Sequence, residues 1–392
     1  MNQKPRILIV DDEPFNLNFL EQELEDLNFE TVTAINGQDA LDKINSQSPD
    51  LVLLDIMMPI LDGFAVLERV KADPAIRDIP IIVISANNDL KSVVKGIQLG
   101  ADDYLPKPFE STLLQARIQS SLEKKRLRDL QDLYTKSLER EMNIARDIQK
   151  EFLPAQLPKV EGWEIANYFK AAKEVGGDFY DAFILPDGTL TFVIADVCGK
   201  GIGAALFMTL FRSLIHAAST TDQLSLEQIK KIFTPAERLI HAVTLANNYV
   251  AETHEAANMF STVFIGILDP INGKLTYING GNAAPLIVGG DGIVHTALAP
   301  TGPVIGVMSH TEYQVKETTI GRDELLLAYT DGIPDTQNAA GEFFGDERIR
   351  SLLNNYRTPA KLLSQFENDL NQFIGTAEQF DDITLFAIKR EQ

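Results

Sequence analysis

Short apolar runs alternate with amphipathic helical patterns along the N-terminal part of the chain. The runs lie at residues 6–10, 31–34, 51–55, 79–85 and 102–106, and the helical patterns at 14–27, 37–46, 64–72 and 89–99. Strands that alternate with helices predict a parallel sheet with right-handed crossovers. Runs as apolar as LVLL at 51–54 are typical of strands buried on both faces. We therefore expect a doubly wound α/β domain with a five-stranded parallel sheet at residues 1–120.

One long helix is predicted at residues 121–153, which contain no glycine or proline and many good helix formers. Its apolar residues recur at steps of three and four, which places them on one face. They are Leu127, Leu130, Tyr134, Leu138, Met142, Ala145, Ile148 and Phe152. This stripe either packs on a neighbouring domain or pairs with a second copy as a short coiled coil, and we favour a homodimer.

From residue 154 onward, strand-like runs follow one another with few helices between them. Strands are predicted at 163–169, 179–185, 189–197, 260–268, 274–280, 285–290, 324–332 and 383–389, and helices at 202–217, 225–250 and 360–374. Pro186, Asp187 and Gly188 form a turn signal between two of the strands. Residues 154–392 should form an α+β sandwich of two mainly antiparallel sheets flanked by helices. The chain is thus predicted to be multidomain, with a helical linker between two domains.

Acidic residues outnumber basic ones by 56 to 35 in the 392-residue chain, which gives a net charge of −21. Such a surface repels nucleic acid, and no basic run compensates for it, so a DNA-binding regulator is disfavoured. Cys198 is the only cysteine, which excludes an internal disulfide framework and fits a reducing compartment. Asp11 and Asp12 come too early for a signal peptide, and no apolar stretch looks long enough to span a bilayer. We expect a cytoplasmic protein without a membrane partner.

Polar side chains stand at the ends of four predicted strands in the N-terminal domain: Asp11, Asp12, Asp55, Ser85 and Lys107. Because the carboxyl ends of parallel strands form the ligand-binding edge of such sheets, these side chains should converge. Neighbouring carboxylates are costly without a cation, and their hard oxygens suit Mg²⁺. A carboxylate can also accept a phosphoryl group as an acyl phosphate. Each aspartate alone is more often a helix cap or turn residue, but the set favours a site.

This domain resembles the receiver domain of two-component response regulators. The matching segments are VDDEP (10–14), LLDIMMPILDG (53–63), ISA (84–86) and YLPKPF (104–109). The resemblance implies that a sensor histidine kinase phosphorylates Asp55. It also implies that Asp12, Asp55 and the carbonyl of Met57 hold Mg²⁺, with Asp11 assisting.

The same resemblance assigns three further residues. Ser85 and Tyr104 would be the switch pair, and Lys107 would bind the phosphoryl group. A cis peptide is implied between Lys107 and Pro108, a bond type that is tolerated before proline.

Aspartates also mark strand ends in the C-terminal domain: Asp178, Asp181, Asp196, Asp331, Asp381 and Asp382. An oxygen-only cluster favours Mg²⁺ or Mn²⁺ over zinc, and two such ions can activate a water for in-line attack on phosphorus. Some of these acids have a simpler interpretation. We expect Asp181 to be a turn residue or an acid behind the ligands, and the pair at 381–382 could be a strand-entry turn. Cys198 is expected to be a packing residue.

The C-terminal domain resembles the PPM family of metal-dependent protein Ser/Thr phosphatases, in particular its bacterial branch that acts in sigma-factor control. The matching segments are ARDIQKEFLP (145–154), EVGGDFYD (174–181), IADVCGKGIGAAL (194–206), FSTVFIGILD (260–269), INGGNAAPLIV (278–288), AYTDGIPD (328–335) and FDDIT (380–384). They occur in the order expected of the family.

The resemblance implies a binuclear site with Asp196 as the bridging ligand beside the carbonyl of Val197. Asp331 and Asp381 would complete this catalytic site, and Asp178 would hold metal-bound water or a further ion. Asp382 lies where the family varies. The chain departs from the common pattern at Cys198 and Lys200 and at residues 281–284, which bears on substrate recognition rather than on metal binding. Lys200 could contact phosphate, although we expect it to be solvated.

The leading interpretation is a response regulator with a phosphatase output. Phosphorylation of Asp55 would raise the Mn²⁺- or Mg²⁺-dependent hydrolysis of phosphoserine or phosphothreonine on a partner, such as an anti-sigma-factor antagonist. The main rival is a scaffold that binds a phosphoprotein without turnover. The complete set of acids argues against it.

Overall fold

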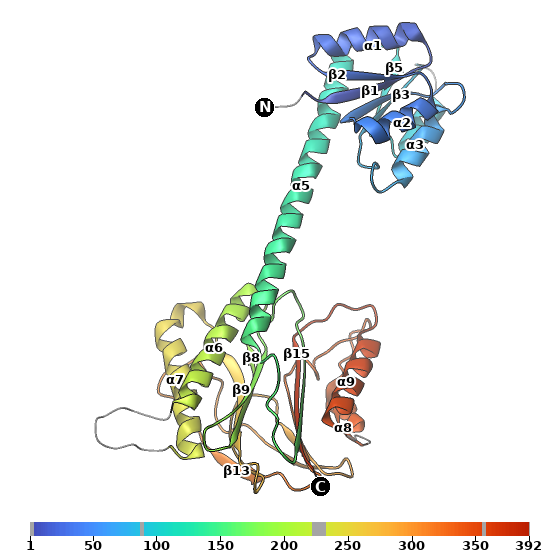
Figure 1. Ribbon diagram of the computed structural model, residues 1–392. Helices are drawn as coiled ribbons and strands as arrows, with labels where there is room; N and C mark the ends of the chain where they lie inside the picture. The colour runs from blue at the N-terminus through green and yellow to red at the C-terminus, as the bar shows by residue number, and fades with distance from the viewer. Residues whose placement is uncertain (1–3, 87–89, 222–232, 355–357, 392) are drawn as a thin grey trace. The chain divides into compact units, whose positions relative to one another are not determined.

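The computed structural model describes residues 4–86, 90–221, 233–354 and 358–391. The chain forms two compact units, and the boundary between them lies between Leu138 and Glu139. Figure 1 shows the helices and strands of both units.

The first unit contains a five-stranded parallel sheet in the order β2-β1-β3-β4-β5, as the sequence predicts. Its strands are β1 (Arg6–Val10), β2 (Glu30–Ala34), β3 (Leu51–Asp55), β4 (Ile81–Ala86) and β5 (Asp103–Lys107), and its shorter helices are α1 (Pro14–Asp26), α2 (Gly37–Gln47), α3 (Gly63–Ala72) and α4 (Leu90–Gln98). One core joins the sheet to α1, and the other joins it to α2 and α3. This arrangement brings the carboxyl ends of β1, β3 and β5 to one edge.

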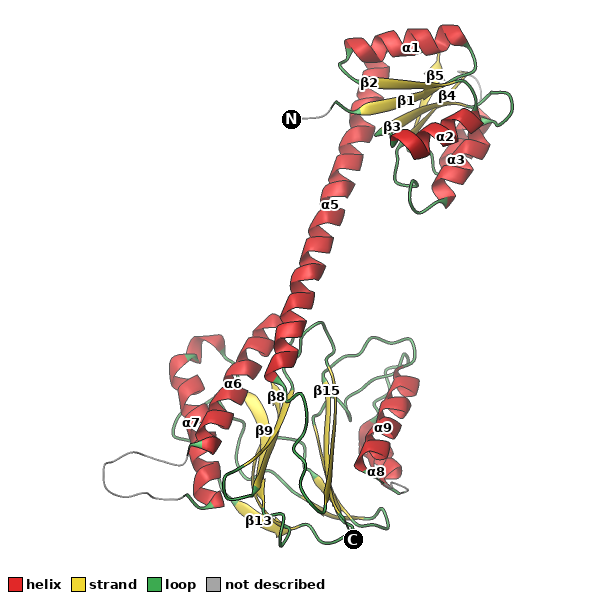
Figure 2. Ribbon diagram, in the orientation of Figure 1, coloured by secondary structure: helices red, strands yellow, loops and turns green. Residues whose placement is uncertain are grey.

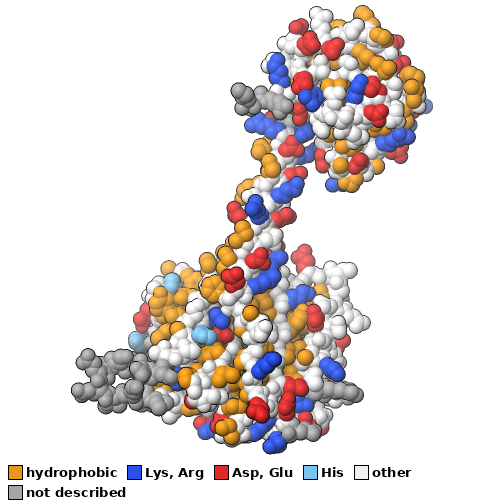
Figure 3. Space-filling view, viewed as in Figure 1, with side chains coloured by type: hydrophobic (Ala, Val, Ile, Leu, Met, Phe, Trp, Pro, Cys, Tyr) orange, Lys and Arg blue, Asp and Glu red, His pale blue; other side chains and the backbone are white. Residues whose placement is uncertain are grey.

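The helix α5 (Ser111–Phe152) is longer than the predicted linker. It begins inside the first unit, where Leu114 and Ile118 are fully buried against the sheet, and it ends inside the second. The last helix of the α/β domain and the linker are therefore one element. Figure 3 shows hydrophobic side chains interspersed with charged ones along it.

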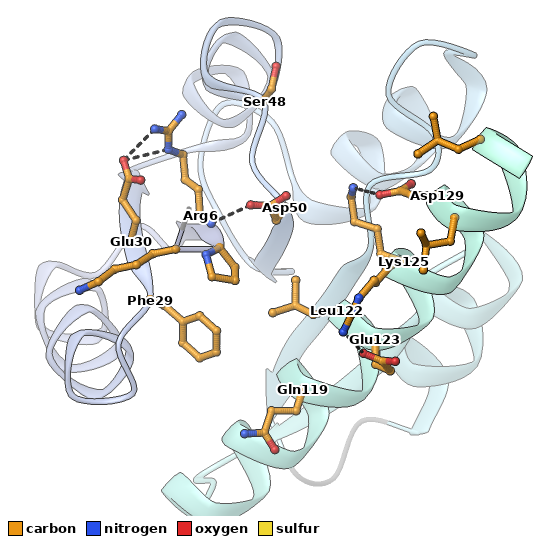
Figure 4. Close-up of a pocket in the computed structure, with 15 residues that line it drawn as sticks. Arg6, Phe29, Glu30, Ser48, Asp50, Gln119, Leu122, Glu123, Lys125 and Asp129 are labelled. Carbon is orange, nitrogen blue, oxygen red and sulfur yellow. Dashed lines mark hydrogen bonds and ion pairs between the residues drawn. The ribbon is translucent and has the colours of Figure 1, made fainter. Parts of the chain in front are cut away.

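A cavity of about 890 Å³ lies within the first unit, between the amino-terminal end of the sheet and α5 (Figure 4). The Arg6 side chain pairs with Glu30 at 2.8 Å on one wall, and Lys125 pairs with Asp129 at 2.7 Å on the other. Since these charges satisfy each other, the cavity does not present a single-sign surface.

The second unit contains two antiparallel five-stranded sheets, as predicted (Figure 2). The first has the order β13-β10-β9-β8-β7 and the second the order β12-β11-β14-β15-β6. The strands are β6 (Trp163–Lys170), β7 (Phe179–Ile184), β8 (Leu190–Val197), β9 (Ser261–Leu268), β10 (Lys274–Gly280), β11 (Leu286–Val288), β12 (Val294–Ala297), β13 (Lys316–Thr319), β14 (Leu325–Tyr329) and β15 (Ile383–Arg390). The predicted turn joins β7 to β8, where the N–H of Leu185 donates to the carbonyl of Thr189 at 2.9 Å.

Helices flank both sheets. The first sheet packs against α6 (Ile202–Thr220) and α7 (Pro235–Thr253), and the second against α8 (Gly345–Leu353) and α9 (Pro359–Ile374). A short 3-10 turn, η1, spans Glu255–Ala257. Between the sheets, Tyr180 and Phe192 of the first lie against Phe386 of the second. The site described below lies at one end of this interface between sheets.

Three expectations about helices need correction. The helix predicted at 225–250 begins at Pro235 in the described part of the chain, where Thr234 and Glu237 form a capping box, and residues 222–232 lie outside that part. Helix α8 was not predicted. Contrary to the expectation from sequence, α6 is long and apolar enough to cross a membrane by length and composition, and it is one such helix among the described residues. In the structure its Met208, Phe211 and Ile215 are buried against the first sheet.

Candidate active site

The strand ends of the first unit gather an acidic pair around one ammonium group. The Lys107 Nζ lies 2.8 Å from Asp11 Oδ2 and 2.6 Å from Asp55 Oδ1. The backbone N–H of Met57 donates to the other Asp55 oxygen at 2.9 Å. The Ser85 hydroxyl donates to the Tyr104 hydroxyl at 3.2 Å. Lys107 of β5 thus contacts Asp55 of β3 and Asp11 just after β1, and a separate hydrogen bond joins β4 to β5.

Burial and charge act against each other at this edge. Burial raises the pKa of Asp55 although Lys107 opposes the effect. For Lys107, burial acts to lower the pKa, but hydrogen bonds to Asp11 and Asp55 outweigh it and the pKa is raised. The peptide between Lys107 and Pro108 is cis, as the receiver resemblance implies. Asp12 is exposed on the loop that follows β1. It remains a predicted Mg²⁺ ligand together with the Met57 carbonyl.

In the second unit, Asp178 precedes β7 and is almost fully buried at 1% exposure. One of its oxygens, Oδ2, accepts hydrogen bonds from the hydroxyls of Thr330 at 2.7 Å and Thr384 at 2.5 Å. Burial, reinforced by Asp196 and Asp382, raises the pKa of Asp178 well above its usual value. An acid just before β7 is therefore held by one hydroxyl just after β14 and one hydroxyl within β15.

The aspartates at the ends of β8 and β14 have raised pKa values. Burial first, and then the negative charges of Asp331 and Asp381, raise the pKa of Asp196 to about 7. Asp331 is exposed as a residue. Burial of its carboxyl group by nearby protein atoms, and then the charges of Asp381 and Asp335, nevertheless raise its pKa. Because a negative charge raises the pKa of a carboxyl group only from nearby, Asp196, Asp331 and Asp381 lie in one region of the domain.

Asp382 anchors the segment that leads to Asp178. Its carboxylate accepts backbone N–H groups from Ala172 at 2.7 Å, Gly177 at 2.6 Å and Asp178 at 3.3 Å. This close approach explains the Gly-Gly pair. A Cβ on Gly176 would lie 2.3 Å from Asp382 Oδ2, and one on Gly177 would lie 2.5 Å from the Val197 carbonyl oxygen.

Gln149, near the end of α5, was missed as a functional residue from the sequence. Its side-chain amide donates to the Gly176 carbonyl at 2.6 Å and accepts the Gly176 N–H at 3.1 Å. Three residues earlier, Arg146 Nε donates to the carbonyl of Glu174 at 3.0 Å. The end of α5 is therefore bonded directly to residues 174–176, just before Asp178. The signal available in the sequence was a polar residue beside an apolar stripe.

Two expectations about neighbouring residues change. Lys200 is not a solvated lysine: its Nζ lies 3.2 Å from Asp381 Oδ2, bonds to the Phe380 carbonyl and sits over the Phe380 ring. Asp181 is not a turn residue. It is buried within β7, where it pairs with Arg212 at 2.9 Å and with His216 at 2.8 Å, both on α6.

Cys198 contacts Met259 and the Phe260 backbone, which fits the expected packing role.

The donor set fits a divalent cation. No three acidic, histidine or cysteine side chains within the described residues are arranged to hold one ion by themselves. Mg²⁺ needs no such group, because it commonly takes one or two carboxylates and keeps several waters. Partly buried acids that raise one another's pKa form the kind of cluster that a cation would stabilise.

A family model described as "Stage II sporulation protein E (SpoIIE)" matches residues 186–391, more than half of the chain. The chain belongs to the SpoIIE family. A second model, "Response regulator receiver domain", matches residues 7–119. The chain therefore joins a receiver domain to a SpoIIE-type domain, as the two resemblances indicate.

Curated relatives match different lengths of this SpoIIE family member. "Protein IcfG" of Synechocystis sp. is 38% identical over 263 residues, which is 64% of this chain and 41% of that protein. "Probable transcriptional regulator ycf27" of Guillardia theta is 42% identical over 122 residues, 31% of this chain and 47% of that protein. The chain thus spans less than half of the length of these relatives.

Among solved structures, the "SiaA-PP2C domain of Pseudomonas aeruginosa" matches with a TM-score of 0.53 and 22% identity, covering 65% of this chain and 98% of that one. This likeness supports the fold of the SpoIIE-type domain.

Proposed function

We propose that this chain is a cytoplasmic response regulator whose output is a metal-dependent protein phosphatase. A histidine kinase phosphorylates Asp55, and the SpoIIE-type domain removes phosphate from phosphoserine or phosphothreonine on a partner protein. The receiver resemblance supports the kinase, and the resemblance to the sigma-factor branch supports an anti-sigma-factor antagonist as the partner. The observation that carries the proposal is that burial and neighbouring acids together raise the pKa values of Asp178, Asp196 and Asp331.

Each acid has a role in this proposal. Asp196 and the Val197 carbonyl would hold the ions together with Asp331 and Asp381, and Asp178 would orient water or hold a further ion. Asp382 remains a predicted metal ligand. Its carboxylate also holds residues 172–178 in place through three hydrogen bonds from backbone N–H groups. When bound, Mn²⁺ or Mg²⁺ supplies positive charge that offsets the phosphoryl oxygens and makes a water a better nucleophile.

Phosphate release from a phosphoserine protein, measured with Mn²⁺ and with chelator, tests the activity. We expect Asp196→Ala and Asp331→Ala to lower kcat by about a hundred- to a thousandfold, the range for losing one group that stabilises charge in the transition state. Asp187→Ala in the exposed β7–β8 turn is the matched control and should keep the wild-type rate. Full turnover in the presence of chelator would rule out the metal-dependent site. Tight binding of the phosphoprotein without turnover would support the scaffold instead.

The proposed path of control runs through α5. This helix is rooted in the receiver core at Leu114 and Ile118, and its Gln149 bonds to Gly176. A change in how the receiver holds the helix can therefore reach the loop before Asp178. We propose that phosphorylation of Asp55 orders this loop and raises activity.

A further inference from the structure

The two hydroxyls at Asp178 form a directed network. Thr330 follows β14 and Thr384 lies in β15, and they are 1% and 0% exposed. The backbone N–H of Thr384 donates to the Thr330 hydroxyl oxygen at 3.1 Å. The Thr330 hydroxyl therefore accepts from the backbone of Thr384 and donates its one hydrogen to Asp178.

This network engages one side of the carboxylate only. The Asp178 Oδ2 atom accepts both hydroxyls, at 2.7 and 2.5 Å, and each carboxylate oxygen offers about two lone pairs. Its Oδ1 atom takes part in neither of these two hydrogen bonds, and Asp196 lies beside the Asp178 side chain. Threonine suits this task better than serine, because β-branching restricts the first side-chain torsion and presets the direction of the hydroxyl.

We propose that Thr330 and Thr384 are positioning residues that hold Asp178 with Oδ1 toward the ion site and make it a single-oxygen ligand. The proposal rests on the proposed metal-dependent function. The threonines touch neither substrate nor ion, and they act only through Asp178. Residues that orient metal ligands in this way typically contribute about ten- to hundredfold to metal affinity.

Mn²⁺ binding to the full chain, measured by isothermal titration calorimetry, tests the proposal without any turnover. Thr330→Val and Thr384→Val keep the shape of the side chain and remove the hydroxyl. Each should raise the Kd for the weakest-bound ion roughly ten- to hundredfold. Thr384→Ser should recover most of the affinity. At saturating Mn²⁺ the phosphatase rate of each variant should return to within a few-fold of wild type.

Thr191 provides the matched control. It is also fully buried on a strand of the same domain, yet its hydroxyl has no hydrogen-bond partner among the described residues. Thr191→Val should leave the Mn²⁺ Kd unchanged. Equal effects of Thr191→Val and Thr384→Val would reduce the role of Thr330 and Thr384 to packing and overturn the proposal.

Other outcomes are equally decisive. An unchanged Kd in both Thr330→Val and Thr384→Val would overturn the positioning role, even if both proteins were less stable. Should the valine variants fail to fold, Thr384→Ala and Thr384→Ser give the same comparison, and equal affinities in these two would contradict the proposal. If wild type binds no Mn²⁺, it is the proposed function that fails. If wild type binds Mn²⁺ and the valine variants bind it with the same Kd, only the positioning role of Thr330 and Thr384 fails.

Discussion

Gly176 and Gly177 show how a pair of residues without side chains shapes the loop before Asp178. Their backbone N–H groups bond to Gln149 and Asp382, and the space for a Cβ is taken by the Asp382 carboxylate and the Val197 carbonyl. The requirement at both positions is close approach rather than an unusual backbone angle, since neither has a positive φ. Substitution there should therefore displace the loop itself.

A Gly177→Ala variant tests this requirement. Its methyl group would lie 2.5 Å from the Val197 oxygen, so we expect a loss of about 1–3 kcal/mol in unfolding free energy and a large fall in phosphatase rate. Gly203→Ala on α6 is the control, because nothing lies within 4 Å of the added Cβ. Denaturant unfolding and phosphate release measure both effects, and equal stability in the two variants would contradict the steric account.

The elements of the fold were largely predictable, whereas several site contacts were not. Strands such as β3 and β10 could be located because their apolar runs are bounded by polar residues and turns. Helix α8 was missed because its short amphipathic pattern follows a glycine-rich loop. Gln149, Thr330 and Thr384 were missed because neutral amides and hydroxyls leave no charge or periodicity signal, and their roles depend on partners 27 to 206 residues away.

At the scale of elements, Gln149 connects α5 to the loop before Asp178. Replacing it by alanine leaves the buried N–H and C=O of Gly176 without partners, at a cost of about 1–3 kcal/mol. If that energy is lost from the ordered site, kcat should fall roughly five- to hundredfold, because each 1.4 kcal/mol is tenfold. Phosphate release from the Gln149→Ala chain measures this. Gln131→Ala, at an exposed position of the same helix, is the control, and equal rates for the two variants would remove Gln149 from the mechanism.

The middle of α5 offers a second test of the element. Lys136 is exposed and lies within the helix, so Lys136→Pro should break it locally at about 3 kcal/mol. We expect the basal phosphatase rate to survive and the response to acetyl phosphate to vanish. Lys136→Ala should respond like wild type. A proline variant that still responds would show that the signal does not pass along the helix.

At the scale of the whole molecule, the apolar stripe on α5 favours a dimer. Leu127, Leu130 and Tyr134 are 58%, 53% and 72% exposed in a single chain, and Leu130 also lines the cavity of Figure 4. A stripe with helical spacing on a charged helix is typical of a coiled-coil seam. Pairing with a second copy would remove this surface from water.

Sedimentation equilibrium of the full chain tests this, with an expected mass of twice 43.4 kDa. A Leu130→Lys, Tyr134→Lys variant should sediment as a monomer at micromolar concentration. Gln131→Lys with Thr135→Lys adds the same charge outside the stripe and should remain dimeric. A wild-type monomer at high concentration would exclude this pairing.

The bond between Gln149 and Gly176 also has a thermodynamic corollary. Coupling free energies between two binding events are reciprocal. If a phosphoryl analogue held at Asp55 tightens ion binding near Asp178 through this amide, ion binding must tighten the hold on that analogue by the same factor. Ion binding in the SpoIIE-type domain would then raise the affinity of the receiver domain for the phosphoryl analogue. A chain that already holds its catalytic ions would therefore respond at a lower concentration of that analogue.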